Sequence, residues 1–268
     1  VVIDFGKVKK TSQSYFSKPL VELNEGVLLI AMCNDCGHIQ NIAYEETGES
    51  HYNEQYLSSS SFSTLSQEHY NATVNKLVKK CHLTHRSKVV EVGCGDGYFL
   101  SLLAKKNIDC HGYEPSGIFE YIPDIIHLSS YNTFYGGNAN HDKCDLFILR
   151  HVLEHLIDPF EILNEIDSKY LFFEVPSAEY LIENKMYSDF YYDHISYFTK
   201  DSIKYFLNKI EYDLVDLSMS SLSEFHGILA MKRTQIIGDD ILYTPTFAAE
   251  KFDKFRKSFL LIIQLKVC

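Results

Sequence analysis

Short apolar runs alternate with helical apolar patterns through the middle of the chain. Strands are predicted at residues 89–92, 108–113, 125–128, 145–149 and 170–175. Helical spacing of apolar residues predicts helices at 68–80, 98–106 and 159–166. Strands that alternate with helices predict an α/β fold built on a parallel sheet with right-handed crossovers.

The two ends of the chain follow other patterns. Residues 1–45 are rich in turns and β-formers, with a strand predicted at 27–32. Strands at 214–219 and 228–231 have no helix between them, which predicts an antiparallel edge of the sheet. The serine run at 58–61 is typical of a linker. Residues 246–266 are predicted to be helical.

Residues 88–97, Lys-Val-Val-Glu-Val-Gly-Cys-Gly-Asp-Gly, are the most informative segment. A β-branched run passes Glu91 and ends in three alternating glycines, Gly93, Gly95 and Gly97, before a helical pattern. Glycines without a Cβ let a ligand approach the main chain. Glu114 ends the next strand, where a carboxylate can accept hydrogen bonds from a ribose diol. The segment predicts a pocket for an adenosine-containing ligand.

The glycine spacing distinguishes between nucleotides. A dinucleotide fingerprint would place glycine where Tyr98 stands, and a phosphate loop would end in Gly-Lys-Ser or Gly-Lys-Thr. Neither pattern is present, which favours a ligand without phosphate. A glycine-rich turn in some other α/β protein is the alternative.

Composition and charge restrict the domain organisation, the class of substrate and the compartment. The 268 residues are 46% hydrophobic and 23% charged, enough for one well-buried domain with an appendage or for two small domains. The net charge of −11 argues against nucleic acid as a substrate. Seven scattered cysteines favour a reducing compartment. With neither a signal-peptide pattern nor a long apolar run, we expect a cytoplasmic protein without membrane association.

Cys33 and Cys36 form a Cys-x-x-Cys-Gly knuckle, whose tight turn can aim two thiolates at one zinc ion. A structural zinc site needs four ligands, and His38 is a further candidate. A reduced cysteine pair without metal is the alternative interpretation.

Two further segments follow predicted strands at the carboxyl edge of the sheet. Arg150 and His151 are expected to line the pocket, whereas Glu154 and His155 either join it or only cap and pack a helix start. After the fifth strand, an aromatic segment contains Asp193-His194. His194 is either a general base or a histidine of an aromatic core.

The acid-x-Gly-x-Gly-x-Gly pattern with an acid-ended second strand resembles class I S-adenosylmethionine (SAM)-dependent methyltransferases. Four motifs in order resemble nucleotide-sugar C-methyltransferases, which methylate deoxysugars linked to a nucleoside diphosphate. They are Cys-x-x-Cys-Gly-His-Ile-Gln from residue 33, Tyr-Leu-Ser-Ser-Ser-Ser-Phe-Ser from residue 56, the SAM core and Asp-His-Ile-Ser-Tyr-Phe-Thr from residue 193. This family has an N-terminal zinc-binding module, a SAM core and a C-terminal α/β domain.

The resemblance implies a Rossmann-like methyltransferase sheet with an antiparallel last strand and a small β-rich appendage. It divides the chain into an N-terminal zinc or substrate module (1–66), a SAM-binding domain (67–235) and the start of a truncated C-terminal region (236–268). SAM is the implied methyl donor, with zinc as a structural metal. O- or N-methylation of another small molecule and a non-catalytic SAM-binding remnant are the alternatives.

The implied reaction is methylation of a carbon next to a ketone. His194 would remove the proton from that carbon, and Asp193 would orient His194 or bind the sugar. Tyr56 would hydrogen-bond the developing oxyanion. Glu91, Gly93, Gly95, Gly97, Glu114, Arg150 and His151 would hold the donor.

Some positions depart from the family pattern. The first cysteine pair and the C-terminal domain are absent, which predicts a fragment. Tyr192-Asp193-His194 replaces His-Glu-His, and Ser58 and Ser59 stand where the family has aromatics. The sequence therefore does not determine the identity of the sugar or of its nucleoside.

Overall fold

The computed structural model describes residues 2–10, 15–16, 25–46, 56–57, 63–116, 125–136, 143–218, 220–234 and 249–266. Side chains are described in these ranges except at 15–16, 56–57 and 262–266. The serine run at 58–61 lies outside the described residues. Within them, no helix combines the length and apolar character needed to cross a bilayer.

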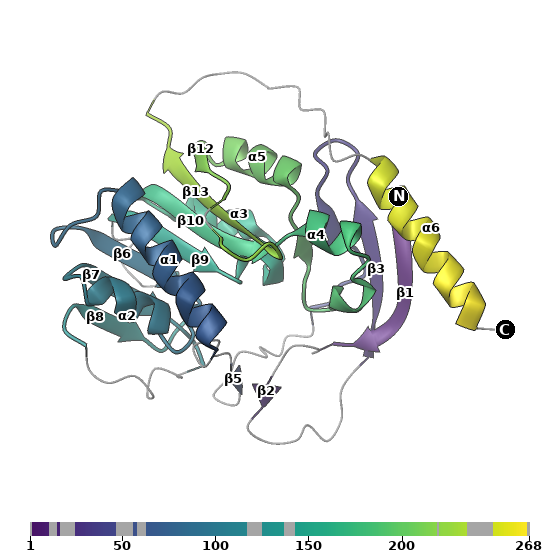
Figure 1. The fold of residues 1–268 in the computed structure, drawn as a ribbon, viewed down its shortest axis with the longest axis horizontal. Helices are drawn as coiled ribbons and strands as arrows, with labels where there is room; N and C mark the ends of the chain where they lie inside the picture. Colours follow the sequence, from purple (N-terminus) through teal and green to yellow (C-terminus); the bar gives the residue numbers. More distant parts are fainter. Residues whose placement is uncertain are drawn as a thin grey trace.

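A seven-stranded sheet forms the centre of the molecule (Figure 1), in the order β12-β13-β10-β9-β6-β7-β8. Its parallel members are β6 (Lys88–Val92), β7 (Asp109–Tyr113), β8 (Leu128–Tyr131), β9 (Cys144–Arg150) and β10 (Ser168–Pro176). Antiparallel to β10 runs β13 (Phe225–Lys232), which also pairs antiparallel with β12 (Tyr212–Asp216). The predicted α/β fold with an antiparallel edge is confirmed.

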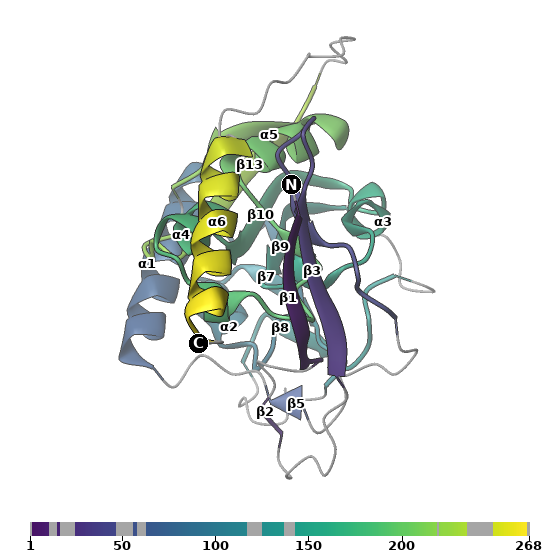
Figure 2. The same ribbon diagram turned by 90° about the vertical axis from the view of Figure 1, so that its right-hand side faces the viewer.

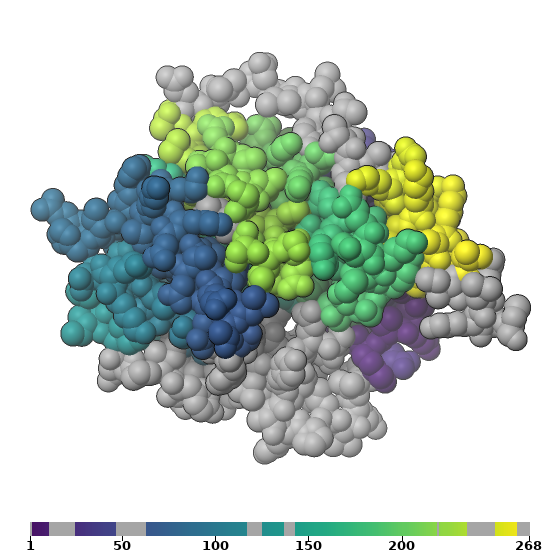
Figure 3. Space-filling model, in the orientation of Figure 1, coloured from purple at the N-terminus to yellow at the C-terminus, as the bar shows by residue number. Residues whose placement is uncertain are grey.

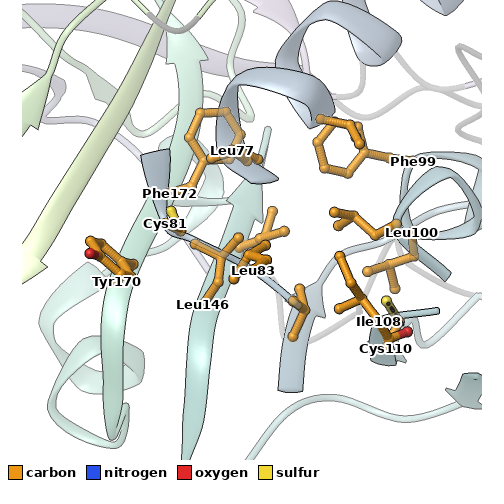
Figure 4. Close-up of a cluster of buried hydrophobic side chains, with 14 of the residues drawn as sticks. Leu77, Cys81, Leu83, Phe99, Leu100, Ile108, Cys110, Leu146, Tyr170 and Phe172 are labelled. Atoms are coloured by element: carbon orange, nitrogen blue, oxygen red, sulfur yellow. Dashed lines mark hydrogen bonds between the residues drawn. The ribbon is translucent and has the colours of Figure 1, made fainter. Parts of the chain in front are cut away.

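Helices cover both faces of this sheet. α1 (Thr64–Lys80) and α2 (Tyr98–Ala104) pack on one face, and α3 (Pro159–Asn164) and α5 (Lys200–Lys209) on the other. Successive strand residues point to opposite faces, so Phe172 joins the first layer and Phe173 the second. Figure 4 shows side chains of the first layer, among them Leu77 from α1, Phe99 from α2 and Leu146 from β9. Burial on both faces explains why these strands are continuous apolar runs.

The third strand was predicted at 125–128 but lies at β8 (Leu128–Tyr131), so that prediction was wrong by three residues. This is an edge strand of sequence Leu-Ser-Ser-Tyr, largely exposed to solvent. The apolar run that suggested the strand forms the preceding turn, where Ile126 is 81% exposed. A solvated edge strand carries no apolar signature, so the pattern pointed to its neighbour.

A second, four-stranded sheet lies beside the first, in the order β1-β3-β4-β11. Antiparallel pairs join β1 (Val2–Lys9) to β3 (Glu25–Met32), β3 to β4 (Ile39–Asn41), and β4 to β11 (Ser196–Tyr197). The last of these strands comes from the segment that follows β10. The small sheet of N-terminal strands is therefore completed by residues that follow the last parallel strand in the sequence.

Helical elements complete a third core around this small sheet. α4 (Ala178–Glu183), η3 (Tyr187–Asp189) and α6 (Ala249–Lys266) pack on it through Leu181, Tyr187 and Phe252. Figures 1 and 2 show α6 running alongside β1 and β3, and Figure 3 shows it in yellow next to the green α4. The boundaries expected at 66 and 235 stay predictions. A division of the chain into consecutive residue ranges separates α4, β11 and α6 from the N-terminal strands, although these elements pack together.

Candidate functional site

A cavity of about 410 Å³ opens at the carboxyl ends of β6, β7 and β9. This volume lies within the range of about 300–1,000 Å³ that is common for small-molecule sites. Three turns that follow these strands form much of its wall, with α1, α2, α3 and the segment 133–136 around them. The carboxyl edge is where open α/β sheets bind ligands.

The glycine turn lines the cavity with bare backbone. Gly93 has φ +67°, and a Cβ there would lie 2.4 Å from Val152 Cγ2, so any other residue would strain the backbone and displace Val152. Gly93 and Gly95 line the cavity. Gly97, at φ +73°, is the N-cap of α2 and is not among the lining residues. The three predicted glycines thus divide into two that face the cavity and one that starts the helix.

Glu114 is fixed at the cavity wall by two backbone groups. Gly95 N–H donates to Oε2 at 3.1 Å, and Ser116 N–H donates to Oε1 at 3.0 Å. Each carboxylate oxygen has a second lone pair. The carboxylate is therefore held in place and can accept further hydrogen bonds from a ligand.

Arg150 lies between the rings of Tyr70 and Phe99, with its guanidinium carbon 4.2 and 4.3 Å from the ring centroids. Its Nη1 is 3.5 Å from Oε1 of Glu91. Glu91 is fully buried behind Arg150 and is not among the lining residues. Burial raises the pKa of Glu91 to about 7, although the Arg150 charge opposes the shift. Glu91 therefore contacts a residue of the cavity wall and does not itself line the cavity.

His151 lines the cavity between two buried carboxylates. Its Nε2 lies 3.3 Å from Glu174 Oε1, and its Nδ1 lies 3.5 Å from Glu154 Oε1. Burial disfavours the charge, but the two carboxylates outweigh it and raise the pKa of His151 to about 9. The backbone φ of His151 is +55°, a strained value for a non-glycine residue that is often found at functional sites.

Glu174 is a functional candidate that the sequence reasoning did not select. Burial opposes its ionisation, but contacts with His151 and His69 outweigh burial and hold its pKa well below the usual range. The available signal was its position, since it stands near the carboxyl end of a buried, otherwise apolar strand. Nothing in the sequence indicated that two histidines and an arginine surround it.

His155 lines the cavity, whereas His194 and Asp193 do not. Asp193 contacts His155 through its backbone, because its carbonyl oxygen accepts a hydrogen bond from His155 Nδ1 at 2.8 Å. The His194 ring stands edge-on behind His155, with centroids 4.7 Å apart. Burial lowers the pKa of His194 to about 3, which keeps it neutral. The structure thus places His155 between the cavity and the predicted base.

Tyr56 lies in β5 (Tyr56–Leu57), which pairs antiparallel with β2 (Tyr15–Phe16). Only the backbone is described there. Its role as an oxyanion partner stays a prediction.

The cysteine knuckle has the predicted turn. Cys33 N–H donates to the His38 carbonyl at 2.8 Å, and Gly37 N–H donates to the Cys33 carbonyl at 3.1 Å. Burial disfavours the Cys33 thiolate, but backbone N–H groups of Cys36 and Asp35 outweigh it and lower the Cys33 pKa. The His38 side chain instead contacts Ser196 Oγ at 3.2 Å in the interior. Within the described residues no third ligand joins the cysteines, so zinc is not supported.

Among the described residues, one other group has metal-ligating side chains together: Glu154, His155 and His194. Their ligand atoms lie within 4.8 Å of one another. No other cysteine, histidine or carboxylate among the described residues joins this group. Of its three members, only His155 lines the cavity.

Comparison with known proteins gives the family. The model described as "Methyltransferase domain" matches residues 65–217. No curated protein sequence shows significant similarity to the chain.

Solved structures with a similar fold include magnesium protoporphyrin IX methyltransferase from Synechocystis PCC 6803 with bound SAH (17% identity, 62% of this chain and 83% of that chain, TM-score 0.48). Others are the plantazolicin methyltransferase BpumL in complex with SAH (15%, 63% and 87%, 0.49) and a SAM-dependent methyltransferase from Aquifex aeolicus (14%, 59% and 88%, 0.47). The family match spans more than half of the chain. The chain therefore belongs to the methyltransferase domain family and is a class I SAM-dependent methyltransferase.

Proposed function

We propose that this enzyme transfers a methyl group from SAM to a carbon atom next to a ketone, on a sugar linked to a nucleotide. The observation that supports it best is the placement of His155 on the wall of the donor cavity with its Nδ1 proton tied to a backbone carbonyl. The four ordered motifs of the sequence support the choice of a nucleotide-linked sugar.

The described residues suit SAM. Glu114 can accept both hydroxyls of the donor ribose, and the bare turn at Gly93 and Gly95 leaves room for the nucleoside. His151 and Arg150 supply positive charge for the donor's carboxylate. The cavity needs no phosphate-binding lysine, because SAM carries no phosphate group. When bound, SAM supplies an electrophilic methyl group on a sulfonium.

His155 is our candidate for the general base. A carbonyl oxygen only accepts, so the Asp193 contact places the His155 proton on Nδ1. In that tautomer Nε2 is the atom that accepts a proton from the acceptor carbon. The buried Glu154 carboxylate lies close to this ring. His194 then packs against the base instead of being the base, a revision of the role that the sequence indicated.

O-methylation of a small molecule without phosphate is the second candidate. The residues that line the cavity disfavour an acceptor whose phosphate would lie inside it. Asp96, Glu161 and Glu165 also line it and would repel a diphosphate. A nucleotide-linked acceptor must therefore keep its diphosphate outside this acidic region. A histidine base would serve a hydroxyl equally well.

Hydrogen exchange tests carbon deprotonation separately from methyl transfer. The protein, SAH and a nucleoside-diphosphate keto-sugar are incubated in D₂O, and deuterium at the carbon next to the ketone is followed by NMR. We expect exchange with the wild type and a rate lower by about 10²–10⁴-fold in His155→Asn. The asparagine amide can retain the hydrogen bond to the Asp193 carbonyl. Exposed His85→Asn is the matched control and should exchange normally.

Turnover with SAM then identifies the methylated atom. A product with the new methyl on carbon supports the proposal, whereas a methyl on oxygen or nitrogen selects the second candidate. Donor binding without exchange or product on any keto-sugar would contradict the carbon-acid mechanism.

A further inference from the structure

We propose that His69 is a positioning residue of the donor site, which acts through Glu174 to hold His151 as the cation facing the donor's carboxylate. This inference rests on the proposed function, because it assumes that His151 receives that carboxylate. His69 itself is not among the residues that line the cavity.

The hydrogen bonds of His69 define its tautomer. Its Nδ1 accepts from Ser221 N–H at 3.3 Å and lies 2.7 Å from Ser221 Oγ. A backbone N–H can only donate, so Nδ1 carries no proton and the neutral ring is protonated at Nε2. Nε2–H therefore donates to Glu174 Oε2 at 2.8 Å. The ring is almost completely buried, so this bond has little competition from water.

Glu174 connects the hydrogen bond of His69 to the residues that line the cavity. With Oε2 held by His69, the other oxygen, Oε1, faces His151 Nε2 at 3.3 Å and Arg150 Nε at 4.0 Å. Oε1 already makes only these charge contacts and no hydrogen bond, so loss of the His69 bond would leave neither oxygen of this buried carboxylate hydrogen-bonded, a costly arrangement. The carboxylate would then turn away from His151 or take up a proton.

The charge of His151 depends on its two carboxylates. Glu154 faces its Nδ1 from η2 (Leu153–His155), and Glu174 faces its Nε2 from β10. Arg150, the preceding residue of β9, is the nearby cation that opposes it. With Glu174 displaced, His151 keeps a single counter-charge. We expect the imidazolium to be lost at a lower pH and the donor to bind less tightly.

Two substitutions at residue 69 separate the two hydrogen bonds. A glutamine amide N–H reaches the place of the imidazole Nε2–H, so His69→Gln retains a donor for Glu174. An asparagine side chain ends near the place of Nδ1, so His69→Asn retains an acceptor for Ser221 and loses the bond to Glu174. Both variants remove the imidazole, and only one removes the proposed function of His69.

SAM affinity is measured by calorimetry from pH 7 to pH 10 for both variants and the wild type. We expect His69→Asn to bind SAM about tenfold more weakly, the usual effect of losing a hydrogen bond to a charged group. Its affinity should also fall off at a lower pH than that of the wild type. His69→Gln should remain within about twofold of the wild type, with an unchanged pH profile.

The buried pair of His226 and Glu179 supplies a matched control. Its Nε2–Oε2 distance is also 2.8 Å, and neither residue lines the cavity. His226→Asn should leave SAM affinity and its pH profile unchanged.

Other outcomes would overturn the inference. Equal affinities and pH profiles for the two His69 variants would show that the bond to Glu174 does not matter. Weaker binding by His226→Asn of the same size would show a general loss of stability. A wild-type protein that does not bind SAM would overturn the proposed donor site itself, before any variant is compared.

Discussion

Gly93 occupies a position that no other residue can take without moving a neighbour. A Cβ at Gly93 would meet Val152 Cγ2 at 2.4 Å, whereas a Cβ at Gly6 has nothing within 4 Å. Both glycines have positive φ, +67° and +74°. Gly93→Ala and Gly6→Ala therefore share the backbone strain and differ in the clash.

We expect Gly93→Ala to weaken SAM binding at least about tenfold, because Val152 would be pushed into the cavity. Gly6→Ala should cost only about 1 kcal/mol of stability and leave binding intact. Calorimetric titration with SAM and thermal unfolding measure the two effects. Equal SAM affinity in both alanine variants would show that Val152 moves without affecting the donor.

The raised pKa of His151 predicts a pH dependence for SAM binding, if His151 receives the donor's carboxylate as proposed above. Its pKa is raised to about 9, so the imidazolium is present below that value and is lost as the pH rises through it. We expect SAM affinity to decline around pH 9 in the wild type. The donor's own amino group titrates at about pH 8, and this contribution is common to all variants.

His151→Gln should therefore remove the part of the decline that lies near pH 9 and leave the part that belongs to the donor. Titrations of both proteins from pH 7 to pH 10 give the difference. A difference that does not change with pH would contradict a charged His151 at the donor site.

At this scale the sequence indicated which residues gather at the cavity, because the carboxyl ends of parallel strands share one edge. The structure places Gly93, Glu114 and His151 there. Their binding roles stay predictions. Sequence spacing could not show that His155 lies in front of His194, since that order depends on how two distant segments pack.

At the scale of elements, the start of α5 connects the two sheets. Thr199 is the N-cap and forms a capping box with Ser202. Its Oγ1 also donates to the Gly37 carbonyl at 3.2 Å, in the cysteine turn. One buried side chain thus begins a helix of the large sheet and holds a turn of the small one.

Thr199→Ala should lower the free energy of unfolding by about 2–3 kcal/mol, because it removes a cap and leaves the Gly37 carbonyl unsatisfied. Asp158→Ala, which removes the exposed N-cap of α3, should cost about 1 kcal/mol. Urea unfolding measures both. A Thr199 effect no larger than that of Asp158 would show that its bond to Gly37 adds nothing.

Elements were predictable where burial leaves a pattern. The two-sided burial of β9 and β10 produces apolar runs that are visible in the sequence. The short strands β4 and β11, of three and two residues, have no periodicity to detect. Their pairing depends on contacts between segments that are far apart in the chain, which local patterns do not encode.

At the scale of the whole molecule, α6 is held to the small sheet by aromatic side chains. Phe252 is fully buried against a core that includes Ile3 and Leu28, whereas Leu261 on the same helix is 58% exposed. Phe252→Ala should lower the free energy of unfolding by about 3–5 kcal/mol.

Leu261→Ala should stay within about 0.5 kcal/mol of the wild type. Urea unfolding followed by circular dichroism measures both, and SAM affinity in the absence of urea should not change, since neither residue lines the cavity. A small effect of Phe252→Ala would mean that the helix is not required for the core of the small sheet.

The pairing of β4 with β11 can form only late in the synthesis of the chain. His38 and Ser196, which share a contact across it, are 158 positions apart. The ribosome synthesises β4 before β11, so the edge of β4 stays unpaired while the central domain is being made. Unpaired strand edges are templates for intermolecular association. Nascent chains that stop short of Tyr197 should accordingly be the aggregation-prone species of this protein.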